Sequence, residues 1–157
     1  MTSPPCALPP RVQLPLHRRV LPLTAVALAR PLAALPPRYV RIVLQGLRVG
    51  ARPSSAAQAS AARAAVVAVS LRCAVHHCLQ RSIAAAVLCR FKGTWPTWQT
   101  GVRTTPFAAH AWIEADGQVI DEPYPDGYYR PLLTVAPTTL KQKRPKGHPH
   151  VRRNPAP

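Results

Sequence analysis

The periodicity of apolar residues changes at Gly93, and this change limits the folds that the chain can adopt. Before Gly93 the apolar residues recur at helical spacing, and we predict helices over residues 37–48, 53–72 and 78–92. After Gly93 they alternate, and we predict strands over residues 98–104, 107–115 and 118–122. Asp116-Gly117 is a strong hairpin turn between the last two strands. Helices followed by an antiparallel meander predict an α+β domain with N-terminal helices packed on a small antiparallel sheet.

Prolines and charges divide the chain into three expected parts. Residues 1–36 are a proline-rich N-terminal arm, residues 37–140 form the folded domain, and residues 141–157 are a basic tail. The tail is too polar and too rich in proline to build a core, so we expect it to be disordered.

The N-terminal part contains a short apolar run that resembles a signal peptide. Pro22 interrupts this run and Arg30 closes it without a convincing cleavage site, so an amphipathic helix or packing arm is expected instead. No proline-free interior stretch is apolar over the ~20 residues that a membrane span requires, and we predict no membrane span. The irregular spacing of Cys6, Cys73, Cys78 and Cys89 favours reduced thiols in the cytoplasm.

Acidic residues occupy one short part of an otherwise basic chain. The sequence has 21 Lys and Arg against 5 Asp and Glu, a net charge of +16. Such a charge is typical of nucleic-acid-binding proteins, but the arginines are scattered among alanine and leucine, so we expect no nucleic acid partner. The acids all lie within 13 residues: Glu114, Asp116, Asp121, Glu122 and Asp126. This concentration beside His110 indicates either a local function or a solvated hairpin.

Cys78 and His110 have the placement of a cysteine nucleophile and its base. Cys78 begins a predicted helix, where free backbone amides and the helix dipole lower a thiol pKa and bind an oxyanion. His110 lies on a predicted strand, and Asp121 and Glu122 on the next strand are placed to orient its imidazole. Taken singly, a cysteine at a helix start is more often a small buried hydrophobe, and a strand histidine is usually structural.

A metal site is the main alternative for this region. Cys73, His76, His77 and Cys78 offer four ligands, but four ligands within six residues crowd around a tetrahedral ion. Zinc motifs usually draw their ligands from two separated pairs, so we predict neither a metal nor another cofactor.

Several segments around these residues also resemble a known family. Cys78-Leu-Gln-Arg-Ser with His110-Ala-Trp downstream is a specific combination, accompanied by Gly93-Thr-Trp-Pro-Thr-Trp, Glu122-Pro-Tyr-Pro and Tyr128-Tyr129-Arg130-Pro131. Over residues 60–137 the chain resembles the lasso-peptide leader peptidases, the transglutaminase-like B proteins of bacterial lasso-peptide biosynthesis. The Arg/Leu/Pro-rich start is similar to that of the free-standing form.

The resemblance implies a papain/transglutaminase-like fold and a cysteine peptidase that removes the leader of a ribosomally made precursor peptide. A separate ATP-dependent macrolactam synthetase would then close the ring. Cys78 and His110 match the family's nucleophile and base. The N-terminal part contains no acids and no strand pattern that would indicate a fused recognition domain, which implies a separate leader-recognition protein. The alternatives are a transferase with the same residues, and a basic accessory protein that binds nucleic acid or membrane without catalysis.

The register of the hairpin decides which acid completes a triad. A two-residue type I′ loop pairs residue 115 with 118 and puts Asp121 on the face of His110. A three-residue loop with Gly117 in a left-handed bulge pairs 114 with 118 and puts Glu122 directly across from His110. The second register agrees with the position of the acid in the resembled family, so we predict Glu122, with Asp121 as the alternative.

Overall fold

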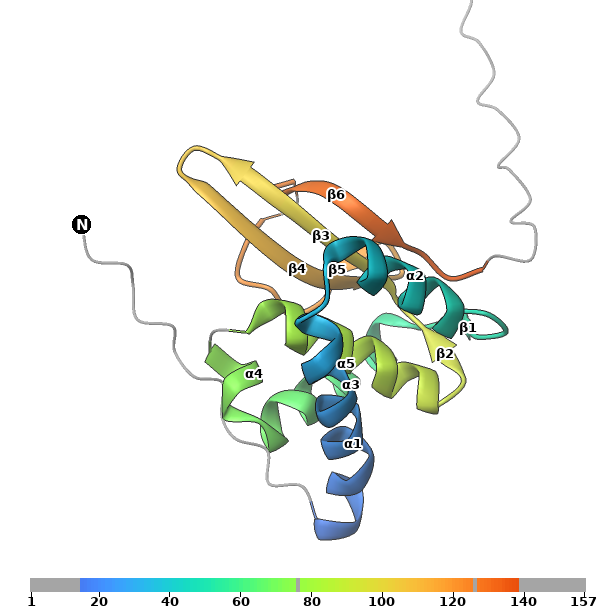
Figure 1. The fold of residues 1–157 in the computed structure, drawn as a ribbon. Coiled ribbons are helices and arrows are strands. Elements are labelled where there is room, and N and C mark those ends of the chain that lie inside the picture. The colour runs from blue at the N-terminus through green and yellow to red at the C-terminus, as the bar shows by residue number, and fades with distance from the viewer. Residues whose placement is uncertain (1–14, 76, 126, 139–157) are drawn as a thin grey trace, which may run out of the picture.

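The protein is described by a computed structural model that covers residues 15–75, 77–125 and 127–138. The helices in these ranges are α1 (Leu16–Ala33), α2 (Pro37–Leu47), α3 (Ala56–Val69), α4 (Leu71–Val75) and α5 (Cys78–Phe91). The strands are β1 (Arg52–Pro53), β2 (Thr94–Trp95), β3 (Thr97–Thr104), β4 (Phe107–Ala115), β5 (Gln118–Val119) and β6 (Arg130–Val135). Helices α1, α3, α4 and α5 lie on one side of the main sheet (Figure 1), which confirms the predicted α+β class.

The main sheet has four strands in the order β5-β4-β3-β6, and every neighbouring pair is antiparallel. The long β3–β4 hairpin pairs Gly101 with His110. Because side chains alternate along a strand, His110, Trp112 and Glu114 project from the same face of β4. Strands β1 and β2 form a separate short parallel pair.

Helix α5 is the centre of the domain and fixes the position of Cys78. Every residue from Gln80 to Cys89 is buried, as expected of a helix that is enclosed on all sides. It packs against α1, α3 and β4. Gly93, with φ of +77°, follows the helix, in agreement with the predicted stop. Cys78 is therefore the first residue of a rigid element that packs against the sheet.

Helix α1 lies in the segment that we predicted as an N-terminal arm or packing helix. Pro22, Ala25 and Ala29 are buried, and α1 packs against α3 and α5. No helix in the described ranges has both the length and the hydropathy needed to cross a bilayer. The division of the chain at residue 36 stays a prediction, and the tail over 141–157 lies outside the described residues.

The end of the chain differs from the sequence prediction in two places. The strand predicted over 118–122 is shorter: β5 covers Gln118 and Val119, and one more backbone hydrogen bond, of 3.0 Å, runs from Ile120 to Ile113. The segment over 123–137, predicted as an excursion across the sheet, contains β6, which pairs with β3. Pro131 concealed this strand because proline lacks the N–H that a ladder needs, and β6 accepts it as the edge strand of the sheet.

Gly101 is required where β3, β6 and Trp112 meet. A Cβ atom at this position would lie 2.3 Å from the carbonyl oxygen of Arg130 and 2.9 Å from Cη2 of Trp112. Gly101→Ala is therefore expected to destabilise the domain by about 1–3 kcal/mol, the usual cost of overpacking, as measured by thermal or urea unfolding.

Gly46 gives a matched control for this substitution. It lies in α2, and a Cβ atom there would meet nothing within 4 Å. Gly46→Ala should leave the stability unchanged or raise it by up to about 1 kcal/mol. Equal melting temperatures for the two variants would contradict the tight approach at Gly101.

Candidate active site

Cys78 occupies the first turn of α5, where backbone donors are free of helical partners. The first helical bond runs from the N–H of Arg81 to the carbonyl of His77, 2.8 Å long. The N–H groups of Cys78, Leu79 and Gln80 therefore precede the helical ladder and point toward the region in front of the helix. Such donors bind the developing negative charge of an acyl-transfer intermediate.

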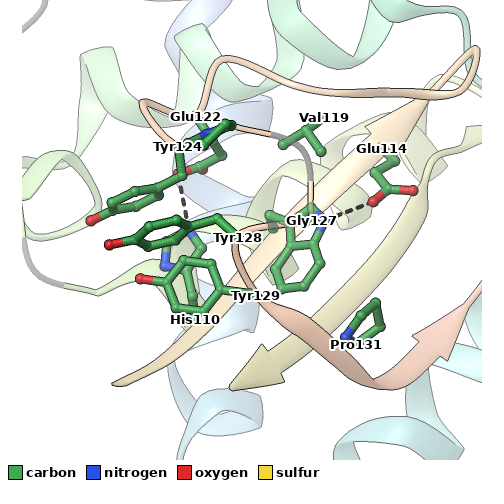
Figure 2. A pocket seen from close by; sticks show the side chains of 11 residues that line it. His110, Glu114, Val119, Glu122, Tyr124, Gly127, Tyr128, Tyr129 and Pro131 are labelled. Atoms are coloured by element: carbon green, nitrogen blue, oxygen red, sulfur yellow. Dashed lines mark hydrogen bonds and ion pairs between the residues drawn. The ribbon is translucent and has the colours of Figure 1, made fainter. Parts of the chain in front are cut away.

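His110 lies between Cys78 and Glu122. Its Nε2 is 2.9 Å from Oε2 of Glu122 (Figure 2), and its imidazole is near enough to Cys78 to lower the pKa of that thiol. Because Glu122 occupies Nε2, Nδ1 is the nitrogen left for the thiol. The structure thus brings together all three residues predicted for the triad, in the order thiol, imidazole, carboxylate.

The predicted hairpin register is wrong, although Glu122 is the acid that contacts His110. Asp116 and Gly117 have φ of 52° and 75°, as in a two-residue type I′ turn, and Ala115 pairs with Gln118. The pairing ends after Ile120, because Asp121 adopts φ of 50° and turns the chain out of the strand. This turn, and not a bulged register, carries Glu122 to the imidazole.

The alternative acid, Asp121, is bound elsewhere. Its Oδ2 accepts a hydrogen bond of 2.7 Å from the hydroxyl of Ser60 on α3. Oδ2 of Asp116 accepts one of 2.7 Å from the backbone N–H of Ala56, at the start of the same helix. Both acids therefore anchor the hairpin and its exit to α3, which fixes the position of Glu122.

Two arginines, buried Arg81 and partly buried Arg63, hold the Glu122 carboxylate. Arg81 donates to both of its oxygens, at 3.2 and 3.4 Å, and to the carbonyl of Cys73 at 3.2 Å. Arg63 on α3 donates to Oε1 at 3.3 Å. The side chain of Glu122 is only 5% exposed. A carboxylate bound in this way stays ionised and has little freedom to leave the imidazole.

The charges of the three groups depend on one another. Burial favours the neutral thiol, yet hydrogen bonds from His110 and the Ala111 backbone and the positive charge of His110 lower the pKa of Cys78. Burial favours the neutral imidazole, yet hydrogen bonds with Cys78 and Glu122 raise the pKa of His110 to about 9. Burial also opposes ionisation of Glu122, but His110 and the two arginines hold its pKa below the usual value. A thiolate–imidazolium pair is therefore favoured near neutral pH.

Aromatic rings enclose His110 on the side away from the helix. Tyr129 stacks on the imidazole with a centroid distance of 5.0 Å, and Trp112 is near-parallel to it at 6.1 Å. Tyr124 meets it edge-on at 5.6 Å and stacks against Tyr128 at 5.0 Å. Figure 2 shows the three tyrosines gathered around His110. These contacts fix the plane of the ring and exclude water from it.

Two hollows flank the Cys78–His110 pair. The lining of the aromatic hollow includes His110, Trp112, Glu114, Tyr124, Tyr128 and Tyr129. The second hollow lies on the side of α1 and α4, and its lining includes Arg30, Arg72, His77 and Cys78.

The other candidate residues have structural roles or lie outside the site. Cys73 and Cys89 are buried, and burial raises the pKa of both thiols. Cys6, His76 and Asp126 lie outside the described residues. Among the residues that are described, no three His, Cys, Asp or Glu side chains are grouped as a metal would need.

The three tryptophans are all buried, and Trp112 also lines the aromatic hollow. Trp95 donates to the Val135 carbonyl and Trp98 donates to Ser82. Ser82 and Arg81, on the helix that Cys78 begins, are buried as well.

Arg63 was missed at the sequence level, although a signal was present. It is the only charged residue between Ala56 and Val69. It also lies four residues after Ala59 and three before Val66, within the stripe that α3 buries. A lone arginine in a buried stripe indicates a buried anionic partner, which here is Glu122.

Comparison with known proteins agrees with the fold. A family model described as the Transglutaminase-like superfamily matches residues 22–134. The match begins in α1 and ends in β6. No match was found among curated proteins or among solved structures. The family model spans well over half of the sequence, and the chain belongs to the transglutaminase-like superfamily.

Proposed function

We propose that this chain is a cytoplasmic cysteine peptidase that removes the leader from a lasso-peptide precursor before a macrolactam synthetase closes the ring. The observation that carries the peptidase assignment is the Cys78–His110–Glu122 arrangement, with Nε2 of His110 2.9 Å from the carboxylate. The leader-peptidase assignment rests in addition on the resemblance over residues 60–137.

The proposed reaction proceeds through a thioester. The Cys78 thiolate attacks the carbonyl carbon of the scissile peptide bond, and the backbone amides at the start of α5 bind the resulting oxyanion. The His110 imidazolium gives its proton to the leaving amine, and the C–N bond breaks to leave an acyl-enzyme. His110, now neutral, takes a proton from water as the water attacks the thioester. Cleavage of that bond releases the leader carboxylate and restores the thiolate–imidazolium pair.

The test of this function uses the purified chain and a lasso-peptide precursor. Mass spectrometry should detect one cleavage, with the water oxygen incorporated into the new carboxylate when the reaction is run in H₂¹⁸O. Product that carries an added amine instead would indicate a transferase with the same residues. The absence of both products, with the recognition protein present, would overturn the proposal.

Efficient cleavage is expected to require a separate leader-recognition protein. A recognition partner that holds the leader near Cys78 raises its effective concentration to the millimolar range. At low micromolar precursor, adding the partner should therefore raise the cleavage rate about 10²-fold or more. Equally fast processing by this chain alone would contradict the requirement. A precursor with a scrambled leader and an unchanged cleavage site is the matched control, since the partner should not accelerate its cleavage.

A further inference from the structure

The Glu114 carboxylate, at one side of the aromatic hollow, has no cationic partner among the described residues. Its Oε1 accepts a hydrogen bond of 2.9 Å from the indole N–H of Trp112, and its Oε2 one of 2.9 Å from the amide of Gln99. Both donors are neutral. They fix the position of the carboxylate and leave its charge uncompensated, in a chain with 21 Lys and Arg against 5 Asp and Glu.

The other described acids have structural partners. Glu122 binds two arginines, Asp121 binds Ser60, and Asp116 binds the first turn of α3. Glu114 differs from them because it is half-buried and lines a hollow beside the proposed catalytic pair. It is therefore the acid that is available to a ligand.

The walls of the hollow are suited to a cation. Faces of tyrosine and tryptophan attract ammonium and guanidinium groups through their ring quadrupoles. The ring of Tyr128 already holds one cation that does not line the hollow, since the guanidinium of Arg103 lies 4.6 Å from its centroid. A neutral apolar group in the hollow would instead remove water from the Glu114 charge without replacing it, which is unfavourable.

The ends of the hollow differ in charge. Figure 2 shows Glu114 and Val119 on the opposite side from the tyrosines and His110. The His110 end becomes cationic when the imidazolium forms, so a positive ligand is favoured at the Glu114 end, against Trp112. The ligand would lie beside the reacting groups without contacting the imidazolium.

We propose that the aromatic hollow, with Glu114 at its side, is a subsite for a cationic group of the substrate, the ammonium or guanidinium of a residue near the scissile bond. The identity of the ligand as part of a peptide rests on the proposed function. The affinity of the hollow for a small cation does not, and it can be measured separately.

The binding test uses the full chain and n-butylammonium, with n-butanol as the neutral probe of similar shape. The indole N–H of Trp112 donates to Glu114 and reports binding as a shift of its ¹H–¹⁵N NMR signal, which is assigned by Trp112→Phe. We expect n-butylammonium to bind at least about tenfold more tightly than n-butanol. Equal affinities would overturn the proposal and show a merely apolar hollow.

Glu114→Gln and Asp116→Asn form a matched pair for the same titration. Both remove one carboxylate, but Asp116 is at the hairpin tip and does not line the hollow. Asparagine also tolerates the φ of 52° there and keeps an oxygen for the Ala56 N–H. The preference for n-butylammonium should disappear in Glu114→Gln and persist in Asp116→Asn. Its loss in both variants, or in neither, would overturn the proposal.

Peptide substrates then separate this inference from the proposed function. Lysine, arginine, norleucine and glutamate are placed in turn at each position flanking the cleavage site. At one position, lysine or arginine should raise kcat/KM about tenfold over norleucine, through KM, and the preference should vanish in Glu114→Gln. If the four residues give equal kcat/KM at every position, the cationic subsite is refuted and the peptidase assignment stands. Saturable cation binding without any cleavage refutes the peptidase assignment and leaves the cation site standing.

Discussion

Glu122→Gln is expected to lower kcat for precursor cleavage by roughly 10³–10⁴-fold, as loss of the orienting carboxylate does in other triads. Glutamine keeps an oxygen for Arg81 but loses the charge that stabilises the His110 imidazolium. Its amide N–H can also donate to Nε2 of His110, which favours the wrong tautomer, the one with the proton on Nδ1. Cleavage is followed by mass spectrometry at saturating precursor. Thermal unfolding must show that the variant is folded at the assay temperature, because Arg63 and Arg81 lose their anion.

The pH dependence of the same variant separates orientation from a merely structural role. In the unmodified chain, hydrogen bonds with Cys78 and Glu122 raise the pKa of His110 to about 9 against the effect of burial. Because His110 acts as the acid toward the leaving amine, kcat/KM should fall as pH rises through that value. Without the Glu122 charge the pKa of His110 falls. The decline of kcat/KM at high pH, the basic limb of the profile, should therefore move to lower pH in Glu122→Gln.

Asp121→Asn is the matched control, since it removes the same charge from the adjacent residue. Asparagine tolerates the φ of 50° and still accepts the Ser60 hydroxyl, so kcat and the basic limb should stay near those of the unmodified chain. If Asp121→Asn were the crippling change and Glu122→Gln the mild one, the assignment of the carboxylate would be wrong.

Local sequence patterns were sufficient for the elements that carry the proposed nucleophile and base. The bounds of α5 and β4 follow from apolar spacing, from Gly93 and from the Asp116-Gly117 turn, each of which acts over a few residues. The α+β class follows from the order of these elements. The placement of Cys78 at a helix start and His110 on a strand needed no tertiary information.

The positions of Glu122, Arg63 and β6 depend on tertiary contacts, which local sequence patterns do not reveal. Glu122 was predicted from a bulged register, whereas it reaches His110 because Asp121 leaves the strand and binds Ser60 on α3. A hydrogen bond between residues 61 apart in sequence has no local signature. The same holds for Arg63, whose partner is 59 residues away, and for β6, whose proline is acceptable only at a sheet edge.

Cys78→Ser is expected to reduce cleavage at least roughly 10⁴-fold, because a serine hydroxyl beside His110 is a far weaker nucleophile than a thiolate. Cys6→Ser, Cys73→Ser and Cys89→Ser should each keep kcat within a few-fold of the unmodified chain when folded. Cys73 and Cys89 are buried, and their substitution should lower the melting temperature, which separates a loss of stability from a loss of chemistry. Full activity in the Cys78 variant would remove the nucleophile from the mechanism.

Alkylation of the unmodified chain tests the same thiol without a substrate. The pKa of Cys78 is lowered, chiefly by His110, against the effect of burial, whereas burial raises the pKa of Cys73 and Cys89. The thiolate fraction falls as pH drops through each pKa, so at pH 6 Cys78 is the described thiol that keeps most of it. Iodoacetamide at pH 6, followed by peptide mass mapping, should modify Cys78 first, and His110→Ala should abolish this selectivity. A basic binding protein without catalysis has no reason to maintain such a thiolate, so equal labelling of Cys6, Cys73, Cys78 and Cys89 would favour that function over the peptidase.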